Sequence, residues 1–501
     1  MTPFLLAFLL QCPDGTPPPC RAPARAVAPA GNSVAVLYFE NVTRDSSDAY
    51  LADGLTEAIA VRLGQLGRLE VKSRGAVRRF RDSQLEPAAL GRQIGAAYLV
   101  SGTVRRSGSR LRVTVELVRS TTGNQLWAQQ FDRSGADLLA IEEDVASSVA
   151  TAIAGRLLPA ERTQLARRPT RNPVAYDHFL RGHYYLALRS PQAVRRAIAE
   201  YESAVRADPR FAAAMGRIAY AYGLILGWGW LEPGWSRDSL IARGTAAADR
   251  ALQLDSGSAE AWLAKASLMP PAGRMRGLLA MVDRAIALDP RNDEARHFRG
   301  WTYFVAEADF SNADADFRAA LAIEPQRPVT LWYLGLSTYA QRRYAESLAL
   351  AESALALDRD FVVARLLAAM NRARLGDADL ARREVDAALS GNPIGPAASL
   401  AQATAVLLEH LAGDTAALRR RVMLLRPGGP GSPPVRSDYS VPVAAALAHL
   451  GELDEAVAVL RTESDPSALM WILLQMPDYD VLRPYPPFQR FLDSIRPESP
   501  R

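Results

Sequence analysis

The feature that most constrains this chain is a pattern that returns at a fixed interval through its C-terminal two thirds. Acidic residues or Asn, four of them followed by Pro, stand at Asp208, Asp255, Asp289, Glu324, Asp358 and Asn392, in steps of 47, 34, 35, 34 and 34 residues. A fixed period near 34 is typical of a solenoid built from helix-turn-helix units. Since one helix pair cannot bury its own apolar face, we expect successive pairs to stack.

The residues inside each unit have the types that stacked helix pairs need. Small residues let the two helices of a pair approach closely, and large residues fill the space between pairs. These positions resemble the tetratricopeptide repeat family, and they are Tyr176, Gly182, Tyr185, Tyr201, Ala204, Ala261, Trp262, Ala285, Gly300, Trp301, Tyr303, Leu331, Leu334, Gly335, Tyr344, Ala354, Gly376, Ala381, Ala388, Pro393, Gly451, Leu453 and Ala456. The resemblance covers residues 174–463 in about seven units, the last two degenerate, and implies an all-α superhelical solenoid.

The resemblance also implies a groove lined by the first helix of each pair, where a protein or peptide partner binds. Turning the period onto that face predicts a partner-binding groove of Tyr220, His297, Trp301, Phe304, Trp332, Tyr339 and Met370. Aromatic grooves suit extended or helical peptides. The alternative is packing between repeats, because a shift of one residue moves each of these side chains into the core.

The 47-residue step contains an insertion rich in Gly and Trp, at residues 227–235. We interpret Trp228, Trp230 and Trp235 either as a lid over the groove or as a locally packed cluster. Exposed aromatic side chains would favour the lid.

Residues 32–160 have a different pattern, in which strand and helix signals mix. The apolar run Val34–Phe39 predicts a buried strand. We further expect helices and strands in the order helix 50–66, strand 69–71, helix 85–94, an antiparallel meander over 98–105, 111–119 and 125–131, and a long helix over 137–158. This is one small α/β domain, so the whole chain is predicted to be α+β.

Five blocks of this domain resemble the TolB-type amino-terminal domain. The blocks are Ser33–Asn41, Tyr50–Glu57, Tyr98–Arg105, Thr122–Ala128 and Phe131–Asp132. The resemblance implies a role in partner docking and brings no catalytic residues. In many bacterial proteins such a domain precedes tetratricopeptide repeats, often behind a kinase, a cyclase or a winged-helix domain.

The first 31 residues hold a short apolar block, Phe4–Leu10, and a Pro-rich linker. The block suits a signal peptide, but no basic residues precede it. Export, lipidation at Cys12 and an N-terminus without a targeting role are the three alternatives. Export would make the protein periplasmic or envelope-associated, with membrane association through the N-terminus. It would also allow the only two cysteines, Cys12 and Cys20, to close a disulfide loop.

Catalytic, cofactor and metal signatures are missing from the sequence, so we predict no enzyme, no cofactor and no metal. Asp53, Glu57, Asp132 and Asp137 are interpreted as solvated or capping carboxylates rather than as a catalytic pair. Gly54 and Asn41 are interpreted as turn residues rather than as part of a small-ligand site.

Nucleic acid is not expected as a partner. Arg residues cluster at 74–81 and 105–112, but the net charge is only +5 over 501 residues and no nucleic-acid module is recognised. Arg that alternates with strand residues is more typical of a solvated face.

These patterns divide the chain into five predicted segments. They are the signal-like segment and linker 1–31, the TolB-like domain 32–160, a linker 161–173, the repeat array 174–463 and a C-terminal cap and tail 464–501. The predicted function is a non-enzymatic interaction scaffold in the bacterial cell envelope. The alternative is a cytoplasmic signalling or transcription regulator related to kinase- or cyclase-linked chains with the same two modules. The oligomeric state stays open.

Overall fold

In the computed structural model the chain divides into two compact units, Met1–Arg167 and Arg168–Arg501. The structure describes residues 30–497 except 44, 46–47, 82, 109, 135–137, 189, 232–233, 270–274, 392, 394–395, 426–438 and 464–467. The signal-like block, Cys12 and Cys20 lie outside the described residues. Within the described ranges, no helix is long and apolar enough to cross a bilayer.

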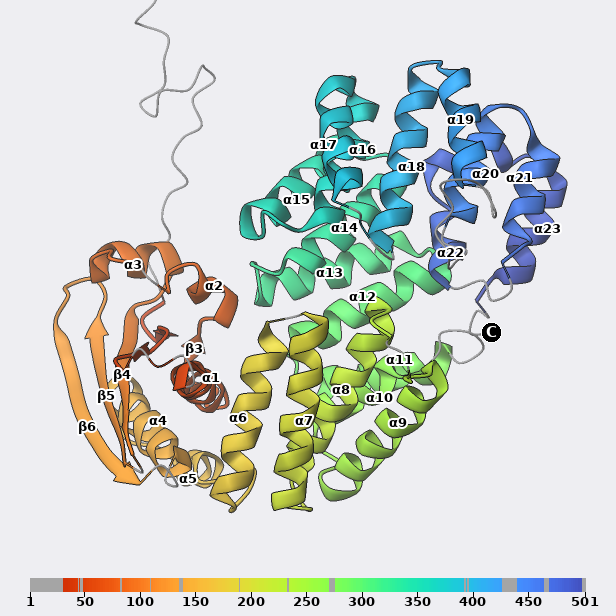
Figure 1. Ribbon diagram of the computed structural model, residues 1–501. Helices are drawn as coiled ribbons and strands as arrows, with labels where there is room; N and C mark the ends of the chain where they lie inside the picture. Colours follow the sequence, from red (N-terminus) through yellow and green to blue (C-terminus); the bar gives the residue numbers. More distant parts are fainter. Residues whose placement is uncertain are drawn as a thin grey trace, which may run out of the picture. The chain divides into compact units, whose positions relative to one another are not determined.

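One mixed sheet forms the centre of the first unit (Figure 1). Strand β1 (Ser33–Val36) lies between β3 (Glu70–Val71) and β4 (Tyr98–Ser107) and is parallel to both. The short β2 (Glu40–Asn41) runs parallel to the later part of β4. All four residues of β1 are buried, as expected for an apolar strand with a neighbour on each side.

The predicted antiparallel meander continues this sheet. Strand β4 pairs with β5 (Arg110–Arg119), and β5 pairs with β6 (Gln125–Ser134). Along β5 buried and exposed side chains alternate, so one face of the hairpin packs on the core and the other is exposed.

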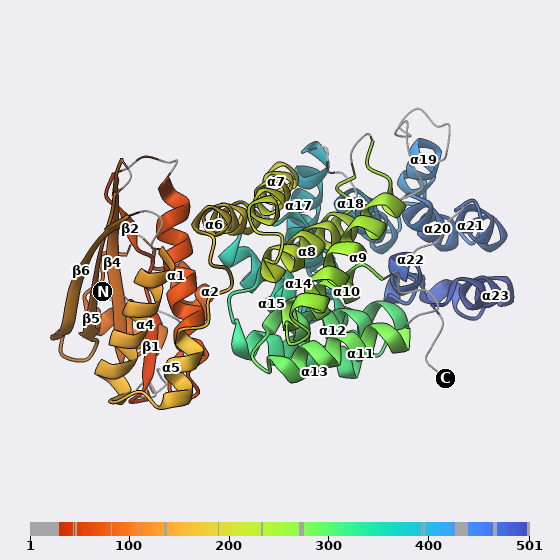
Figure 2. The ribbon, with the colours of Figure 1, turned by 90° about the horizontal axis from the view of Figure 1, so that it is seen from below.

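Helices α1 (Ala49–Gly64) and α4 (Leu138–Ala154) pack against each other on one face of the sheet (Figures 1 and 2). Helices α2 (Arg74–Arg78) and α3 (Pro87–Ile94) form a second apolar cluster with residues of β1 and β4. Pro87 stands in the first turn of α3, as the sequence predicts.

The end of the first unit differs from the prediction. Helix α4 stops at Ala154, where Gly155 adopts a left-handed conformation (φ 76°) that favours glycine. A further helix, α5 (Pro159–Leu165), then occupies the start of the segment predicted as a linker. Glu161 pairs with Arg68 at 2.6 Å, and this contact ties α5 to the first unit. The elements β2 and α2 were not predicted, because two and five residues are too few to show a period.

The second unit is an array of antiparallel helix pairs, as predicted (Figures 1 and 2). The first helices of the eight pairs that the structure describes are α6 (Pro173–Ala187), α8 (Ala212–Trp228), α10 (Ala259–Ser267), α12 (Asp293–Glu307), α14 (Pro328–Ala340), α16 (Val362–Leu375), α18 (Pro396–Leu411) and α20 (Ser440–His449). The second helices are α7 (Pro191–Ala207), α9 (Arg237–Leu254), α11 (Met275–Leu288), α13 (Phe310–Ile323), α15 (Tyr344–Leu357), α17 (Ala378–Ser390), α19 (Thr415–Leu425) and α21 (Leu453–Leu460).

The acidic residues that mark the period have a common structural role. Each lies where a second helix ends, and its side chain accepts a hydrogen bond from the backbone N–H two residues later. The distances are 2.9 Å at Asp208, and 3.1 Å at Asp255, Asp289, Glu324 and Asp358. Such a local turn competes with a further helical turn, which explains why an acidic residue recurs at this point.

Glycines mark the closest approach of the two helices in a pair. A Cβ atom at Gly182 would lie 2.5 Å from the ring of Tyr201, and one at Gly300 would lie 3.0 Å from the ring of Phe317. The large side chain of one helix therefore occupies the space that the glycine of the other leaves open.

Three short elements follow the last pair: α22 (Ala468–Leu473), the 3-10 helix η3 (Pro477–Leu482) and α23 (Pro486–Ile495). They correspond to the predicted C-terminal cap. Buried residues from all three belong to the same apolar cluster as α12, α14, α16, α18 and α20.

Candidate partner-binding face

We call the surface formed by the first helices of the pairs the inner face. Neighbouring first helices contact each other directly, as α8 does with α10 and α16 does with α18. The inner face is where the sequence predicts a partner-binding groove.

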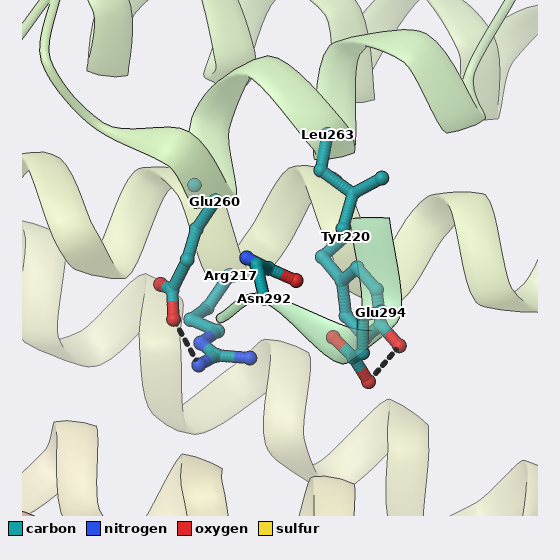
Figure 3. A pocket seen from close by; sticks show the side chains of 7 residues that line it. Arg217, Tyr220, Glu260, Leu263, Asn292 and Glu294 are labelled. Carbon is teal, nitrogen blue, oxygen red and sulfur yellow. Dashed lines mark hydrogen bonds and ion pairs between the residues drawn. The ribbon is translucent and has the colours of Figure 1, made fainter. Parts of the chain in front are cut away.

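A small pocket lies on the inner face where α8, α10 and α12 meet (Figure 3). Its cavity volume is about 30 Å³, and it is lined by Gly216, Arg217, Tyr220, Glu260, Leu263, Asn292 and Glu294. Arg217 pairs with Glu260, and the Tyr220 hydroxyl donates a hydrogen bond of 2.8 Å to Oε1 of Glu294. A space of this size holds one or two water-sized groups, so it can seat the tip of one side chain and no larger ligand.

Arg327, the residue before α14, extends this network. It pairs with Asp293 and, at 3.2 Å, with Glu294. Burial disfavours the charge of Arg327, but the two carboxylates outweigh it and raise the pKa of the guanidinium. Burial raises the pKa of Asp293, and the nearby Glu294 carboxylate adds to the effect. The polar side of the pocket is thus held by charges that neutralise one another.

Aromatic side chains continue the inner face beyond the pocket. The His297 ring lies 2.9 Å from the Thr330 hydroxyl through Nδ1, and Trp301 stacks on Phe298 with ring centroids 5.3 Å apart. Burial raises the pKa of the neighbouring Tyr333 to about 12, while a hydrogen bond with Trp301 opposes the shift. Tyr220, His297 and Trp301 are half-buried, so part of each side chain remains open.

The other four residues of the predicted groove are buried, and their assignment to an open surface is corrected here. The exposed fraction is 1% for Phe304, 7% for Trp332, 0% for Tyr339 and 5% for Met370. All four belong to the large apolar cluster of the second unit. The structure thus divides the predicted set between an open part around α8–α12 and a buried part from the end of α12 to α16.

The C-terminal segment covers the inner face in its second half. Helix α22 packs on α12, and η3 packs on α20. Asp478 of η3 accepts hydrogen bonds from the Tyr339 hydroxyl (3.0 Å) and from Arg374 (2.8 Å), and the Tyr479 hydroxyl donates to the carbonyl of Val441 (3.1 Å). The chain itself therefore occupies the surface that Tyr339 would otherwise offer to a partner.

A histidine pair lies beside this contact, at the ends of α18 and α20. The rings of His410 and His449 are stacked, with centroids 3.7 Å apart. The pKa of His449 is lowered to about 4, mainly by burial and in smaller part by the neighbouring His410 and Arg374. Burial and Arg374 also lower the pKa of His410, which Asp478 partly offsets.

The Trp-rich insertion is packed locally. Helix α8 runs through Trp228, whose ring stacks on Trp230 with centroids 5.9 Å apart. Trp235 lies edge-on to Tyr222 at 6.4 Å, and both Trp230 and Trp235 contact the apolar cluster of the first pairs. These contacts favour the locally packed alternative, and the lid remains a prediction.

The charged residues singled out in the first unit neutralise one another. Asp53 pairs with Arg81, Glu57 with Arg74 at 2.7 Å, and Asp132 with Arg110 at 2.7 Å and Arg112 at 2.8 Å. Asp137 lies outside the described residues. The Arg clusters at 74–81 and 105–112 are thus engaged in part by carboxylates of the same domain.

The two residues considered for a small ligand have ordinary structural roles. Asn41 accepts hydrogen bonds from Thr43 and donates to the carbonyl of Asp45 at 2.8 Å, which is turn chemistry. Gly54 lies inside α1 and is buried, so its interpretation as a turn residue is wrong. Among the described residues, no group of three or more His, Cys, Asp or Glu could hold a metal ion.

The features of the site that the sequence did not predict are contacts between residues that lie far apart in the chain. Arg327 meets Asp293 and Glu294 across one repeat, a spacing that the 34-residue period could have suggested. Asp478 meets Tyr339 from 139 residues away, and no local pattern indicates that contact.

No protein-family model matches the chain. Over 198 residues it is 29% identical to a putative adenylate cyclase 3 of Rhizobium meliloti, a match that covers 40% of this chain and 34% of the relative. Over 113 residues it is 28% identical to tetratricopeptide repeat protein 13 of Homo sapiens, covering 23% of this chain and 13% of the relative. The chain therefore spans about a third or less of the length of these relatives.

The chain also matches solved structures, but only at low structural similarity. A structure of IFIT1 with the capped RNA m7Gppp-AAAA matches with a TM-score of 0.44 and 13% identity, over 70% of this chain and 76% of that chain. A similarity at this level carries no argument about function. The period, the paired helices and the sequence match to a tetratricopeptide repeat protein agree with one another, and the chain is an α+β protein in which a small α/β domain precedes a tetratricopeptide-type solenoid.

Proposed function

We propose that this protein is a non-enzymatic scaffold that binds a protein or peptide partner on the inner face of its first four helix pairs, α6 to α13. The observation that carries the proposal is the contrast along the inner face. Tyr220, which lines a polar pocket, and His297 and Trp301 are half-buried, whereas the predicted groove residues further along are buried. Half-exposed aromatic side chains beside fixed charges are typical of surfaces that recognise peptides.

The stability of the C-terminal segment supports this location. Trp471, Ile472, Leu474, Leu482 and Phe488 of that segment are 5% exposed or less. Burying one such side chain stabilises by about 1.5–3 kcal/mol before the cost of ordering the segment is subtracted. A partner on the second half of the inner face would first have to displace this packed segment, so we place the partner on the first pairs.

The chemistry of the open part suits a peptide that presents both apolar and polar side chains. Tyr220 and Trp301 offer apolar contact area at a low cost in side-chain entropy. The pocket between Arg217, Glu260 and Glu294 takes the tip of one polar side chain. We do not expect nucleic acid on this face, because the two arginines at the pocket, Arg217 and Arg327, are already paired with carboxylates of the same face and are not arranged to bind phosphate groups.

Site-specific photo-crosslinking in cells tests the location. A photoreactive amino acid replaces Glu260, which is exposed beside the pocket, or Arg250, which is exposed on the second helix α9. We expect a discrete crosslinked product at position 260 and none at position 250. Equal products at both positions, or a product at position 250 alone, would contradict the proposal. A salt-dependent shift with RNA or DNA would contradict the exclusion of nucleic acid.

The cell envelope is the compartment that we propose, on the basis of the apolar block Phe4–Leu10. The second candidate is a signalling role, favoured by the sequence match to a putative adenylate cyclase. Mass spectrometry of the mature N-terminus distinguishes them. A cleaved or lipidated N-terminus, or a disulfide between Cys12 and Cys20, supports the envelope, and an intact reduced N-terminus in the cytoplasmic fraction supports signalling.

A further inference from the structure

The outer strand of the first unit carries an inference that is independent of the inner face. We propose that β6 pairs antiparallel with β6 of a second copy of this chain, so that two sheets join into one. The sheet order places β6 at an edge, and in the described part of the chain its only strand neighbour is β5. It is ten residues long, and eight of its side chains are exposed. An edge strand of this length presents a row of unpaired backbone N–H and C=O groups.

The usual devices that block an edge strand are missing from most of β6. Proteins protect edges with short strands, Pro, Lys or a bulge. The stretch Gln125–Phe131 contains no Pro, no Gly and no charged residue. The ladder has one irregularity, next to the turn, where Leu126 of β6 has no partner between Gln125 and Trp127; from Trp127 to Ser134 the register is regular. This part of β6 is therefore a template for another strand.

The opposite edge of the sheet determines what kind of association is possible. That edge is β3, which has only two residues. If β6 of one copy added to β3 of the next, the ladder would be two residues long and the chains could form an open filament. Pairing β6 with β6 uses the long edge of both copies and closes a two-fold dimer, which leaves only the two short edges free.

The side chains of β6 also suit pairing with a second copy. Asp132 is held by Arg110 and Arg112, and Arg133 pairs with Asp144 of α4 at 2.9 Å. Both lie near one end of the strand. A two-fold pair centred in the uncharged stretch places them opposite uncharged residues near Gln125, so no like charges meet.

The two faces of the strand remain matched in this arrangement. Trp127 and Phe131 stand opposite the buried Leu117 and Val113 of β5, and they share the core face. Because cross-strand neighbours point to the same side, the apolar residues of one copy meet those of the other. Ala128 and Gln130 lie on the exposed face, opposite Glu116 and Thr114.

Multi-angle light scattering on the full chain, over a dilution series, tests the proposal. We expect a mass of twice 54.4 kDa that falls to 54.4 kDa on dilution. The double variant Ala128→Lys, Gln130→Lys places like charges across the two-fold axis, and we expect its dissociation constant to rise at least tenfold. The control Thr114→Lys adds one Lys on the same face, opposite Gln130 but one strand away from the edge, and should retain the dimer.

Three results would overturn the proposal. They are a monomer at every concentration, a dimer that persists in the double variant, and equal dissociation by Thr114→Lys. Circular dichroism confirms that each variant is folded. If the double variant unfolds, slower hydrogen exchange of the 125–134 amides at high concentration than at low concentration supports the pairing, and concentration-independent exchange rejects it.

Discussion

Single side chains decide how closely the helices of a pair approach, and Gly182 is the clearest case. A Cβ atom there would lie 2.5 Å from the buried ring of Tyr201. We expect Gly182→Ala to destabilise the array by about 1–3 kcal/mol, because overpacking costs more than the gain in helix propensity. Thermal unfolding followed by circular dichroism measures the change.

The matched control is Gly227→Ala, near the end of α8, where a Cβ atom would meet nothing within 4 Å. Here only helix propensity acts, so we expect stabilisation of up to about 1 kcal/mol. Equal effects of the two substitutions would show that the close approach at Gly182 has no energetic weight.

The histidine pair makes stability depend on pH. The pKa of His449 is lowered from 6.5 to about 4 in the folded chain, mainly by burial. The unfolded chain therefore binds more protons between these two values, so the stability that is present above pH 6.5 falls as the pH drops towards 4. In His449→Gln we expect the melting temperature to fall less steeply over this window than in the natural chain. If the melting temperatures of the variant and the natural chain fall equally steeply with pH, His449 is not the cause of the pH dependence.

The sequence predicted residue types better than residue environments. The acidic residues of the period were visible because each bonds its own backbone two residues later. The sequence predicts that Tyr339 and Trp332 line an open groove, but the structure buries them. A groove position becomes a core position if the helical period is shifted by one residue, or if another segment of the chain covers it. Local spacing carries no information about such a cover.

At the scale of elements, the docking of η3 depends on one carboxylate. Asp478 bonds both Tyr339 and Arg374, whose side chain is 19% exposed. Asp478→Ala leaves both partners without this contact in a site with little water, so we expect a loss of about 2–3 kcal/mol. Chemical denaturation of the full chain measures it.

Asp480→Ala provides the comparison for this prediction. Asp480 belongs to the same short helix but pairs with Arg342 and, at 2.6 Å, with Arg483, whose side chains are 61% and 38% exposed. Exposed ion pairs contribute little, so the expected loss is below about 1 kcal/mol. If Asp480→Ala destabilises the chain as much as Asp478→Ala, the docking of η3 does not rest on the Asp478 contact.

Elements with a period or an alternation were predictable, and short elements were not. The 34-residue repeat predicted the helix pairs from α6 to α21, and the alternation along β5 predicted the meander. The helix α5 was missed because two prolines and several Arg residues around it are typical of a linker. Its place follows from Arg62 and Arg68 of the first unit, which lie about 100 residues earlier in the chain.

At the scale of the whole molecule, the inner face of the array is divided into two parts. Its first part is open around Tyr220 and Trp301, and its second part is covered by residues 470–482 of the same chain. Aromatic side chains therefore line both parts of the inner face, but those of the second part pack against the C-terminal segment of the same chain. Under the proposed function, this division, rather than the number of repeats, determines where a partner binds.

Hydroxyl-radical footprinting of the intact, native chain tests that division directly, because aromatic rings and Met sulfur react in proportion to their contact with water. We predict that Tyr220 and Trp301 are modified quickly, and that Phe304, Trp332, Tyr339 and Met370 are modified only after unfolding. Rapid modification of Tyr339 and Met370 in the native chain, at rates equal to that of Tyr220, would contradict the account.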